Sequence, residues 1–181
     1  YGTGKGTHNG SCGSSAGHGG NGASGGPSCG YTPAPGSSYG DSQNPVTLGS
    51  SGGQSGTGQS KGGGAITINS LTGTVTVSSG GIIDFNGQDG TINNSGGGSS
   101  GSILINSNII TGSGTIRANG GTGQLGYNGG AGGRVALHYV TSNAITPTVT
   151  GNAGGAGVGG LGTTNITSIP ATPSLSSPAD A

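Results

Sequence analysis

The pattern Gly64-Ala-Ile-Thr-Ile68 occurs again as Gly101-Ser-Ile-Leu-Ile105 and as Gly133-Arg-Val-Ala-Leu137. Each copy opens on glycine and places a β-branched or leucine side chain at alternate positions, which is typical of a strand. The copies are 37 and 32 residues apart, a spacing at which internal repeats form stacked supersecondary units. Because one unit has too little apolar surface to bury alone, stacking of the three units is expected.

Each copy is followed by a second short run. The first two runs, Ile82–Gly87 and Gly114–Gly120, end in Asn-Gly, and the third is a looser match at Thr148–Asn152. No segment has helical periodicity. The sequence therefore predicts an all-β fold, either a glycine-rich β-solenoid (β-helix-like) or a β-sandwich of three repeats. The expected strands span residues 65–69, 74–77, 81–85, 102–105, 108–111, 114–118, 134–140 and 145–150.

Changes in composition divide the chain into three parts. Residues 1–60 form an irregular glycine-rich arm, residues 61–162 the β-repeat domain, and residues 163–181 a Thr/Ser/Pro-rich extended tail or linker. In the arm, glycines recur at three-residue intervals, for example Gly17, Gly20 and Gly26. Three residues per turn is the period of a polyproline-II-type helix, so a small bundle of such segments is an alternative to irregular loops.

The charge is very low, with four Lys or Arg and four Asp or Glu in 181 residues. Such a chain lacks the basic surface that nucleic acid or an anionic membrane requires. No apolar run approaches the roughly 20 residues that span a bilayer, and a secretion signal, if any, would lie upstream of Tyr1. With 48 glycines, the chain is expected to depend on dense backbone hydrogen bonding rather than on a thick hydrophobic core.

Both cysteines, Cys12 and Cys29, lie in the arm. A disulfide between them would stabilise the arm by about 3 kcal/mol in the chain-entropy model and would indicate an oxidising, extracellular compartment. The alternative is a zinc site that adds His8 and His18, but the tight Cys or His pairs of such sites are missing. The sequence therefore predicts no metal and no cofactor.

Three phrases resemble a known class of protein. They are Ser38–Ser50, Ser99–Ile105 and Gly129–Tyr139, which contain Tyr-Gly-Asp, Gly-Ser-Ile-Leu-Ile and Gly-Gly-Arg-Val-Ala-Leu-His-Tyr. In this order they are similar to the glycine-rich repeat modules of very large secreted or surface proteins of microbial eukaryotes and bacteria. The chain departs from that pattern by fewer glycines before Ile103, by Val135 and by His138. The resemblance implies an extracellular structural or adhesive module without catalytic residues.

Catalytic chemistry has few candidates. Asp84 and Asp89 are the only neighbouring carboxylates, and glycoside hydrolysis needs two within about 5–10 Å. The simpler interpretation is that both carboxylates cap turns. His138 with a serine lacks any nucleophile-elbow phrase. The sequence predicts that the protein is not an enzyme and has no catalytic residues.

Glycans are the modification that the sequence supports best. Asn9, Asn93 and Asn165 begin Asn-x-Ser/Thr sequons. The Pro-rich tail offers O-glycan candidates, namely Thr172, Ser174, Ser176 and Ser177. Four tyrosines could stack on sugar rings or anchor glycine loops against the sheet: Tyr31, Tyr39, Tyr127 and Tyr139.

These patterns favour a structural subunit of an extracellular filament or cell-surface coat. The expected partners are copies of the chain itself and covalent glycans, with surface polysaccharide as a further candidate, and no nucleic acid or membrane span is expected. Self-assembly would use flat β-faces, sheet edges or extended termini. A carbohydrate-binding or adhesive surface module is the alternative. Ice binding ranks below it because Thr72, Thr74 and Thr76 do not repeat in register with Thr111 and Thr115, and a polysaccharide lyase ranks last.

Overall fold

The computed structural model describes residues 2–8, 12–24, 32–53, 60–124, 128–154 and 157–171. These residues contain strands and extended segments but no helix. The strands are β1 (Ala65–Val77), β2 (Ile82–Asp84), β3 (Ser102–Gly112), β4 (Thr115–Arg117), β5 (Arg134–Asn143), β6 (Ala153–Gly154), β7 (Gly157–Val158) and β8 (Thr163–Ser168).

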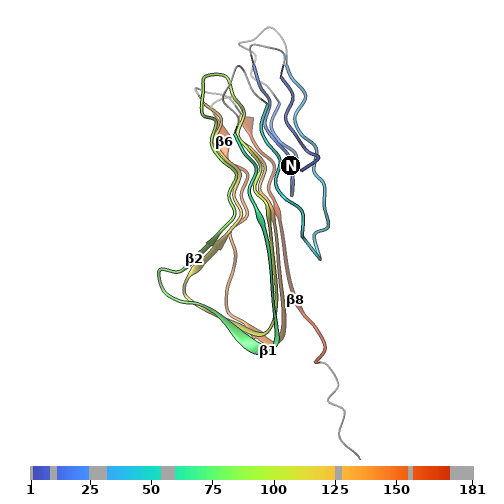
Figure 1. Cartoon of the computed structure of the whole chain (residues 1–181), viewed down its shortest axis with the longest axis vertical. Helices are drawn as coiled ribbons and strands as arrows, with labels where there is room; N and C mark the ends of the chain where they lie inside the picture. Colours follow the sequence, from blue (N-terminus) through green and yellow to red (C-terminus); the bar gives the residue numbers. More distant parts are fainter. Residues whose placement is uncertain are drawn as a thin grey trace, which may run out of the picture.

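The principal sheet has four strands in the order β1-β3-β5-β8, and every neighbouring pair is parallel. The register aligns the strand starts, so that Ala65, Ser102, Arg134 and Thr163 lie side by side. The four strands form the long flat side of the lower half of the molecule (Figure 1). Each strand pairs with the one before it with their starts aligned, so successive strands of the chain extend the sheet in one direction.

A second, shorter parallel sheet pairs β2 with β4, and an isolated parallel bridge from Arg117 to Thr148 continues it. The chain reaches it by a turn at the lower end, where Gly80 has φ +78°, a conformation that side chains other than glycine rarely adopt. The hydrophobic core lies between the two sheets. Its fully buried members include Ile103, Ile105 and Leu137.

The upper half of the molecule is built without strands of the principal sheet (Figure 1). It consists of extended glycine-rich segments that lie side by side, and we refer to them as the glycine bundle. Its segments are residues 2–8, 12–24, 32–39, 47–53, 60–64, 85–90, 95–101, 118–124, 128–133, 148–152 and 157–162.

The hydrogen bonds of the glycine bundle change neighbour with every residue. In the segment 96–101, the amides of Gly96 and Ser99 donate to residues 53 and 50 of one neighbour. The next pair, Gly97 and Ser100, donates to residues 128 and 131 of a second segment, and Gly98 and Gly101 donate to residues 88 and 85 of a third. A three-residue repeat of donors is the pattern of a polyproline-II-type helix with three residues per turn. The bundle segment 96–101 therefore forms backbone hydrogen bonds in three directions, whereas a strand forms them only in the plane of its sheet.

This packing requires glycine because neighbouring backbones approach closely. A Cβ built on Gly130 would lie 2.0 Å from the carbonyl oxygen of Gly98, and one built on Gly98 would lie 2.1 Å from the carbonyl oxygen of Lys61. Serine is the other common residue of the interior, where its hydroxyl bonds to backbone groups. Ser99 is fully buried, and its Oγ accepts a hydrogen bond of 2.8 Å from the Ser50 amide.

These observations correct the predicted fold class. The described residues form an open four-stranded parallel sheet, and neither a closed β-solenoid nor a β-sandwich of three repeats is present. A sandwich of hairpins would require antiparallel pairs, but the principal strands are all parallel. A solenoid would continue its sheets through every segment of the repeat. Here the glycine-rich segments between the strands instead form hydrogen bonds with neighbours in three directions within the bundle.

Two further differences concern the ends of the chain. The predicted irregular arm is regular where the structure describes it, and it shares the bundle with later segments, as in the bond from the Ala16 amide to the Gly97 carbonyl. The predicted extended tail begins with a strand, because residues 163–168 are β8 and pair with β5. Gly162-Thr-Thr-Asn-Ile166 is thus a fourth copy of the repeat, in which Thr164 and Asn165 conceal the apolar alternation.

Candidate functional site

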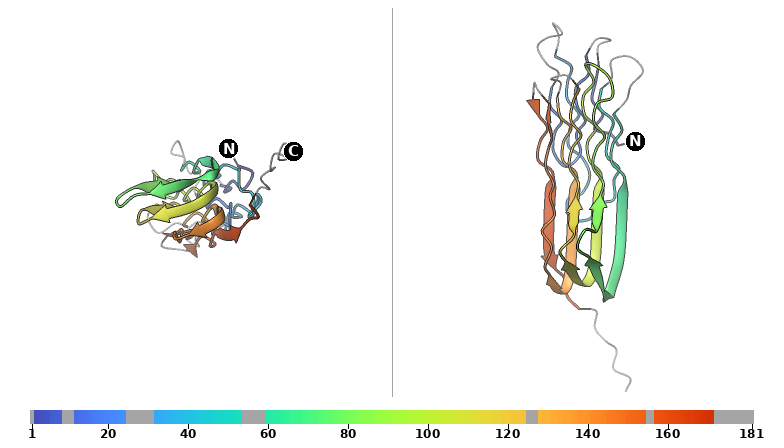
Figure 2. Two further views of the ribbon diagram at one scale, coloured as in Figure 1. Left: turned by 90° about the horizontal axis from the view of Figure 1, so that it is seen from below. Right: turned by 90° about the vertical axis from the view of Figure 1, so that its left-hand side faces the viewer.

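The two edges of the principal sheet are the most distinctive surfaces of the described chain. β1 and β8 are its terminal strands, and among the described residues neither has a second strand partner. They form the opposite lateral margins of the lower half of the molecule (Figure 2, right). Unpaired edges present rows of free N–H and C=O groups, and proteins usually protect them with charges, prolines or covering segments. Neither β1 nor β8 contains a charged residue or a proline.

The hydrophobic core continues to both edges. One row of core residues runs across the sheet as Ile68, Ile105, Leu137 and Ile166. Ile105 and Leu137 are fully buried, but Ile166 at the β8 edge is 40% exposed. Val158 and Leu161, in the bundle segment that leads into β8, are 65% and 72% exposed. Exposed apolar side chains therefore lie along the β8 side of the molecule.

The outer face of the sheet, which points away from the hydrophobic core, has a polar row in the same direction. Asn106 Nδ2 donates to Asn69 Oδ1 at 2.7 Å, and His138 Nδ1 donates to Asn106 Oδ1 at 2.9 Å. The register places Thr167 of β8 next in this row. Side-chain pairs of this kind between neighbouring strands stabilise a register.

A buried polar cluster joins the N-terminal segments to the sheet. The Arg134 guanidinium donates from Nε to the Tyr39 carbonyl at 2.8 Å and from Nη1 to Thr163 Oγ1 at 3.0 Å. The ring of Tyr39 packs on His18 with centroids 4.7 Å apart, and His18 Nε2 lies 2.8 Å from Thr47 Oγ1. Through this cluster, residues from four separate parts of the chain are fixed to the start of β5.

The electrostatics of this cluster keep His18 neutral. His18 is fully buried, and its burial, together with the nearby Arg134 charge, lowers its pKa to about 4. Burial also lowers the pKa of Arg134 below its ordinary value, while the nearby Asp41 opposes that change. A neutral imidazole packed on a tyrosine ring and hydrogen-bonded to a threonine hydroxyl has a structural role here, because both contacts join segments of the fold.

The two tyrosines that the structure describes are partly buried and make contacts within the fold. Tyr39 packs on His18, and its hydroxyl donates to the Leu48 carbonyl and contacts Ser50 Oγ. Tyr139 packs against the hydrophobic core. Tyr31 and Tyr127 lie outside the described residues. Tyr39 and Tyr139 thus serve different parts of the fold and share no exposed platform.

The aspartates considered for catalysis are engaged in contacts between neighbouring repeats. Asp84 Oδ2 accepts from Arg117 Nη2 at 2.6 Å, and Asp84 Oδ1 accepts from the Asn86 amide in a local turn. Asp89 Oδ1 accepts from the Thr122 amide at 2.6 Å. These contacts give both carboxylates a structural role.

The structure describes only some of the residues of the predicted disulfide and of the alternative zinc site. Cys12 is buried, while Cys29 lies outside the described residues, so the Cys12–Cys29 disulfide stays a prediction. Within the described ranges, no three His, Cys, Asp or Glu side chains come together as a metal site would require.

The predicted glycosylation sites fall in different environments. Asn93 is exposed in a turn at the far end of the glycine bundle. Asn165 lies in β8 and is half-buried, and its Oδ1 accepts a hydrogen bond from the hydroxyl of Thr167, the third residue of the same sequon. Asn9, Thr172, Ser174, Ser176 and Ser177 lie outside the described residues.

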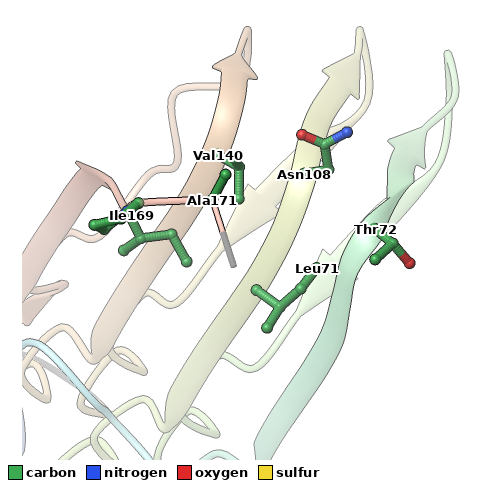
Figure 3. A pocket seen from close by; sticks show the side chains of 7 residues that line it. Leu71, Thr72, Asn108, Val140, Ile169 and Ala171 are labelled. Carbon is green, nitrogen blue, oxygen red and sulfur yellow. The ribbon is translucent and has the colours of Figure 1, made fainter. Parts of the chain in front are cut away.

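A groove of about 250 Å³ opens on the outer face of the sheet. Leu71 and Thr72 of β1, Asn108 of β3 and Val140 of β5 line it, together with residues 169–171 where the chain leaves β8 (Figure 3). The lining contains no charged or aromatic side chain. Such a groove lacks the convergent polar groups that orient a small ligand.

The comparisons with known proteins add no relative. No protein-family model, no curated protein and no solved structure matches this chain. Within the part of the chain that the structure describes, no helix is long and apolar enough to cross a membrane. The resemblance to glycine-rich repeat modules therefore stays a prediction.

Sequence reasoning expected assembly through sheet edges but missed strand β8, which forms one of them, and the buried cluster. The sequence carries a signal for each. The recurrence of glycine before every strand start includes Gly162, which points to β8. Arg134 occupies a strand-opening position that is uncharged in the other three copies, so its charge signals a partner elsewhere in the chain.

Proposed function

We propose that this chain is a structural subunit of an extracellular filament or cell-surface coat, and that its copies assemble through the edges of the principal sheet. The observation that carries the proposal is the pair of unprotected edges, β1 and β8, which belong to one sheet and run in the same direction. An edge of this kind is a template for pairing with another chain.

The direction of the strands decides what such pairing builds. Because all four strands are parallel, the two edges are different surfaces, and contact between unlike surfaces leaves one of each free at the ends. Heterologous contacts that do not close produce open filaments rather than rings. The formal net charge of zero means that copies repel one another little.

The extracellular assignment rests on composition. Two cysteines, three sequons and a Ser/Thr/Pro-rich C-terminal stretch are features of secreted proteins. Covalent glycans would supply the solubility that the few charges do not. The described carboxylates and histidines have structural partners, which favours a structural role over catalysis.

Electron microscopy and sedimentation of the purified full chain test the proposal. We expect elongated particles whose length increases with protein concentration, because edge pairing follows mass action. A chain that sediments as a monomer at millimolar concentration, with intact secondary structure, would refute the proposal.

A further inference from the structure

We infer that copies of this chain join head to tail through one interface, in which β1 of one copy pairs in parallel with β8 of the preceding copy and Ala65 lies beside Thr163. This inference rests on the proposed function and specifies its surface, its strand direction and its register.

The first argument is the register within one chain. Ala65, Ser102, Arg134 and Thr163 are successive partners, and residues 70, 107, 139 and 168 are successive partners at the other end of the six-residue overlap. β1 and β8 thus occupy equivalent positions at the two ends of one stack. The step that relates neighbouring strands inside the molecule can therefore place β1 of a second copy on β8.

A recurring hydrogen bond defines that step. The Ser102 amide donates to the Gly64 carbonyl, the Arg134 amide to the Gly101 carbonyl, and the Thr163 amide to the Gly133 carbonyl, each at 3.0 Å. The next member of the series joins the Ala65 amide of a second copy to the Gly162 carbonyl of the first. N–H and C=O groups of one strand residue point the same way and alternate along the strand, so Thr67 and Thr164 also direct their backbone groups outward.

The side chains match in this register. Ile68 of the second copy would cover Ile166, which is 40% exposed in the single chain, and would extend the buried core row. On the outer face, Thr67 would lie beside Asn165, and Asn69 beside Thr167. The polar row of Asn69, Asn106 and His138 would then continue from one copy into the next. No pair in the overlap brings two charges together, because neither β1 nor β8 is charged.

The glycine bundle permits the same step. The Gly97 amide donates to the Asn128 carbonyl, and the Gly129 amide donates to the Gly157 carbonyl, so this layer of the bundle advances by one repeat together with the sheet. The exposed Val158 and Leu161 lie in the last segment of the layer. A parallel pairing of β1 on β8 places bundle against bundle and sheet against sheet, whereas an antiparallel pairing of two β1 edges would set each bundle beside the other copy's sheet.

Disulfide trapping in the full chain tests the register. One variant carries Thr67→Cys and a second carries Asn165→Cys, and the two are mixed under mild oxidation. Directly paired residues of neighbouring strands lie about 4.8 Å apart, within the 4.4–6.8 Å that a disulfide spans. We expect mixed dimers to exceed those of either variant alone by at least tenfold. The matched control, Asn69→Cys with Asn165→Cys, is two residues out of register at about 8 Å and should not cross-link.

Edge-blocking prolines test the direction of assembly. Thr67→Pro and Thr164→Pro each remove an N–H that points away from the sheet, which an edge strand tolerates. Each variant alone should fail to elongate, because one of its edges is blocked. An equimolar mixture should form dimers that grow no further, since the open β8 edge of the first variant meets the open β1 edge of the second.

The outcomes separate the interface from the proposed function. Cross-linking of a single variant with itself would show contact between like edges and overturn the inference. Filaments that form without the mixed cross-link, or in spite of both prolines, would also overturn it but leave the structural function intact. Absence of any assembly in the unmodified protein would refute both. If a proline variant does not fold, the cysteine pair still decides the question.

Discussion

The lower and upper halves of this molecule repeat along the same direction but are held together by different forces. In the lower half, β-branched side chains such as Ile103 and Ile105 are fully buried between two sheets. In the upper half, glycine backbones pack against one another, and buried serines such as Ser99 bond to main-chain groups. The hydrophobic effect stabilises the first, and saturated hydrogen bonding with close backbone contact stabilises the second.

The two halves show that a repeat can keep the same spacing between neighbouring copies while the stabilising interactions change from hydrophobic burial at one end to backbone hydrogen bonding at the other. The step is the same because the bonds that cross the junction are the same: Ser102 to Gly64, Arg134 to Gly101 and Thr163 to Gly133. Glycine thus opens each strand at the point where the bundle ends and the sheet begins.

The largest effect should come from adding one methyl group to the glycine bundle. Gly130→Ala would place a Cβ 2.0 Å from the carbonyl oxygen of Gly98, and this backbone cannot move without breaking several hydrogen bonds. We expect a loss of about 4 kcal/mol or more, above the usual cost of overpacking, measured by denaturant unfolding. The matched control is Gly80→Asn, at a positive φ where a Cβ meets nothing within 4 Å and asparagine is tolerated. Equal costs for the two variants would mean that the bundle is not close-packed.

A somewhat smaller effect should follow from removing bulk in the hydrophobic core. Ile105→Ala leaves a cavity beside the fully buried Leu137, and we expect a loss of about 3 kcal/mol. Leu71→Ala serves as the control because Leu71 is 43% exposed, and its change should stay below about 0.5 kcal/mol. A core variant as stable as this control would show that the lower half, like the upper, depends on its backbone.

The smallest effect concerns pH and the junction between the two halves. The pKa of His18 is lowered to about 4 in the folded chain, against about 6.5 in an unfolded chain. Between these values the unfolded state binds more protons, so stability is complete above pH 6.5 and falls as the pH drops toward 4. We expect a loss of about 2.5 kcal/mol across this window, visible as a lower Tm. His18→Gln should remove the pH dependence in that window, and an unchanged slope in this variant would assign it to other groups.

Much of the strand pattern was readable from the sequence. Alternating apolar residues after Gly64, Gly101 and Gly133 predicted strands that the structure contains as β1, β3 and β5, and their spacing predicted that these units stack. The fourth strand was missed because Thr164 and Asn165 replace apolar residues, and a strand at an edge needs to bury less. The solenoid or sandwich drawn from these strands was wrong, because glycine-rich stretches were treated as connections although they carry their own hydrogen-bonded architecture.

The candidate site was harder to predict than the strands. The exposure of the β1 and β8 edges depends on which strands are neighbours, and strand order is a property of the whole fold. The cluster of His18, Tyr39 and Arg134 joins residues up to 116 positions apart, a separation at which no local pattern applies. The sequence suggested that tyrosines could anchor loops, and the contacts of Tyr39 agree with that alternative.

The glycine-led β-repeats and the near absence of charge follow from the amino-acid sequence alone, because side-chain alternation and composition are local properties. The parallel order of the repeats in one open sheet, the hydrogen bonding of the glycine segments in three directions and the two unlike unpaired edges are established by the folded chain. They cannot be read from the sequence because a backbone hydrogen bond carries no side-chain signature. Its partner is chosen by packing, and in this molecule packing is set by how closely glycine lets two chains approach.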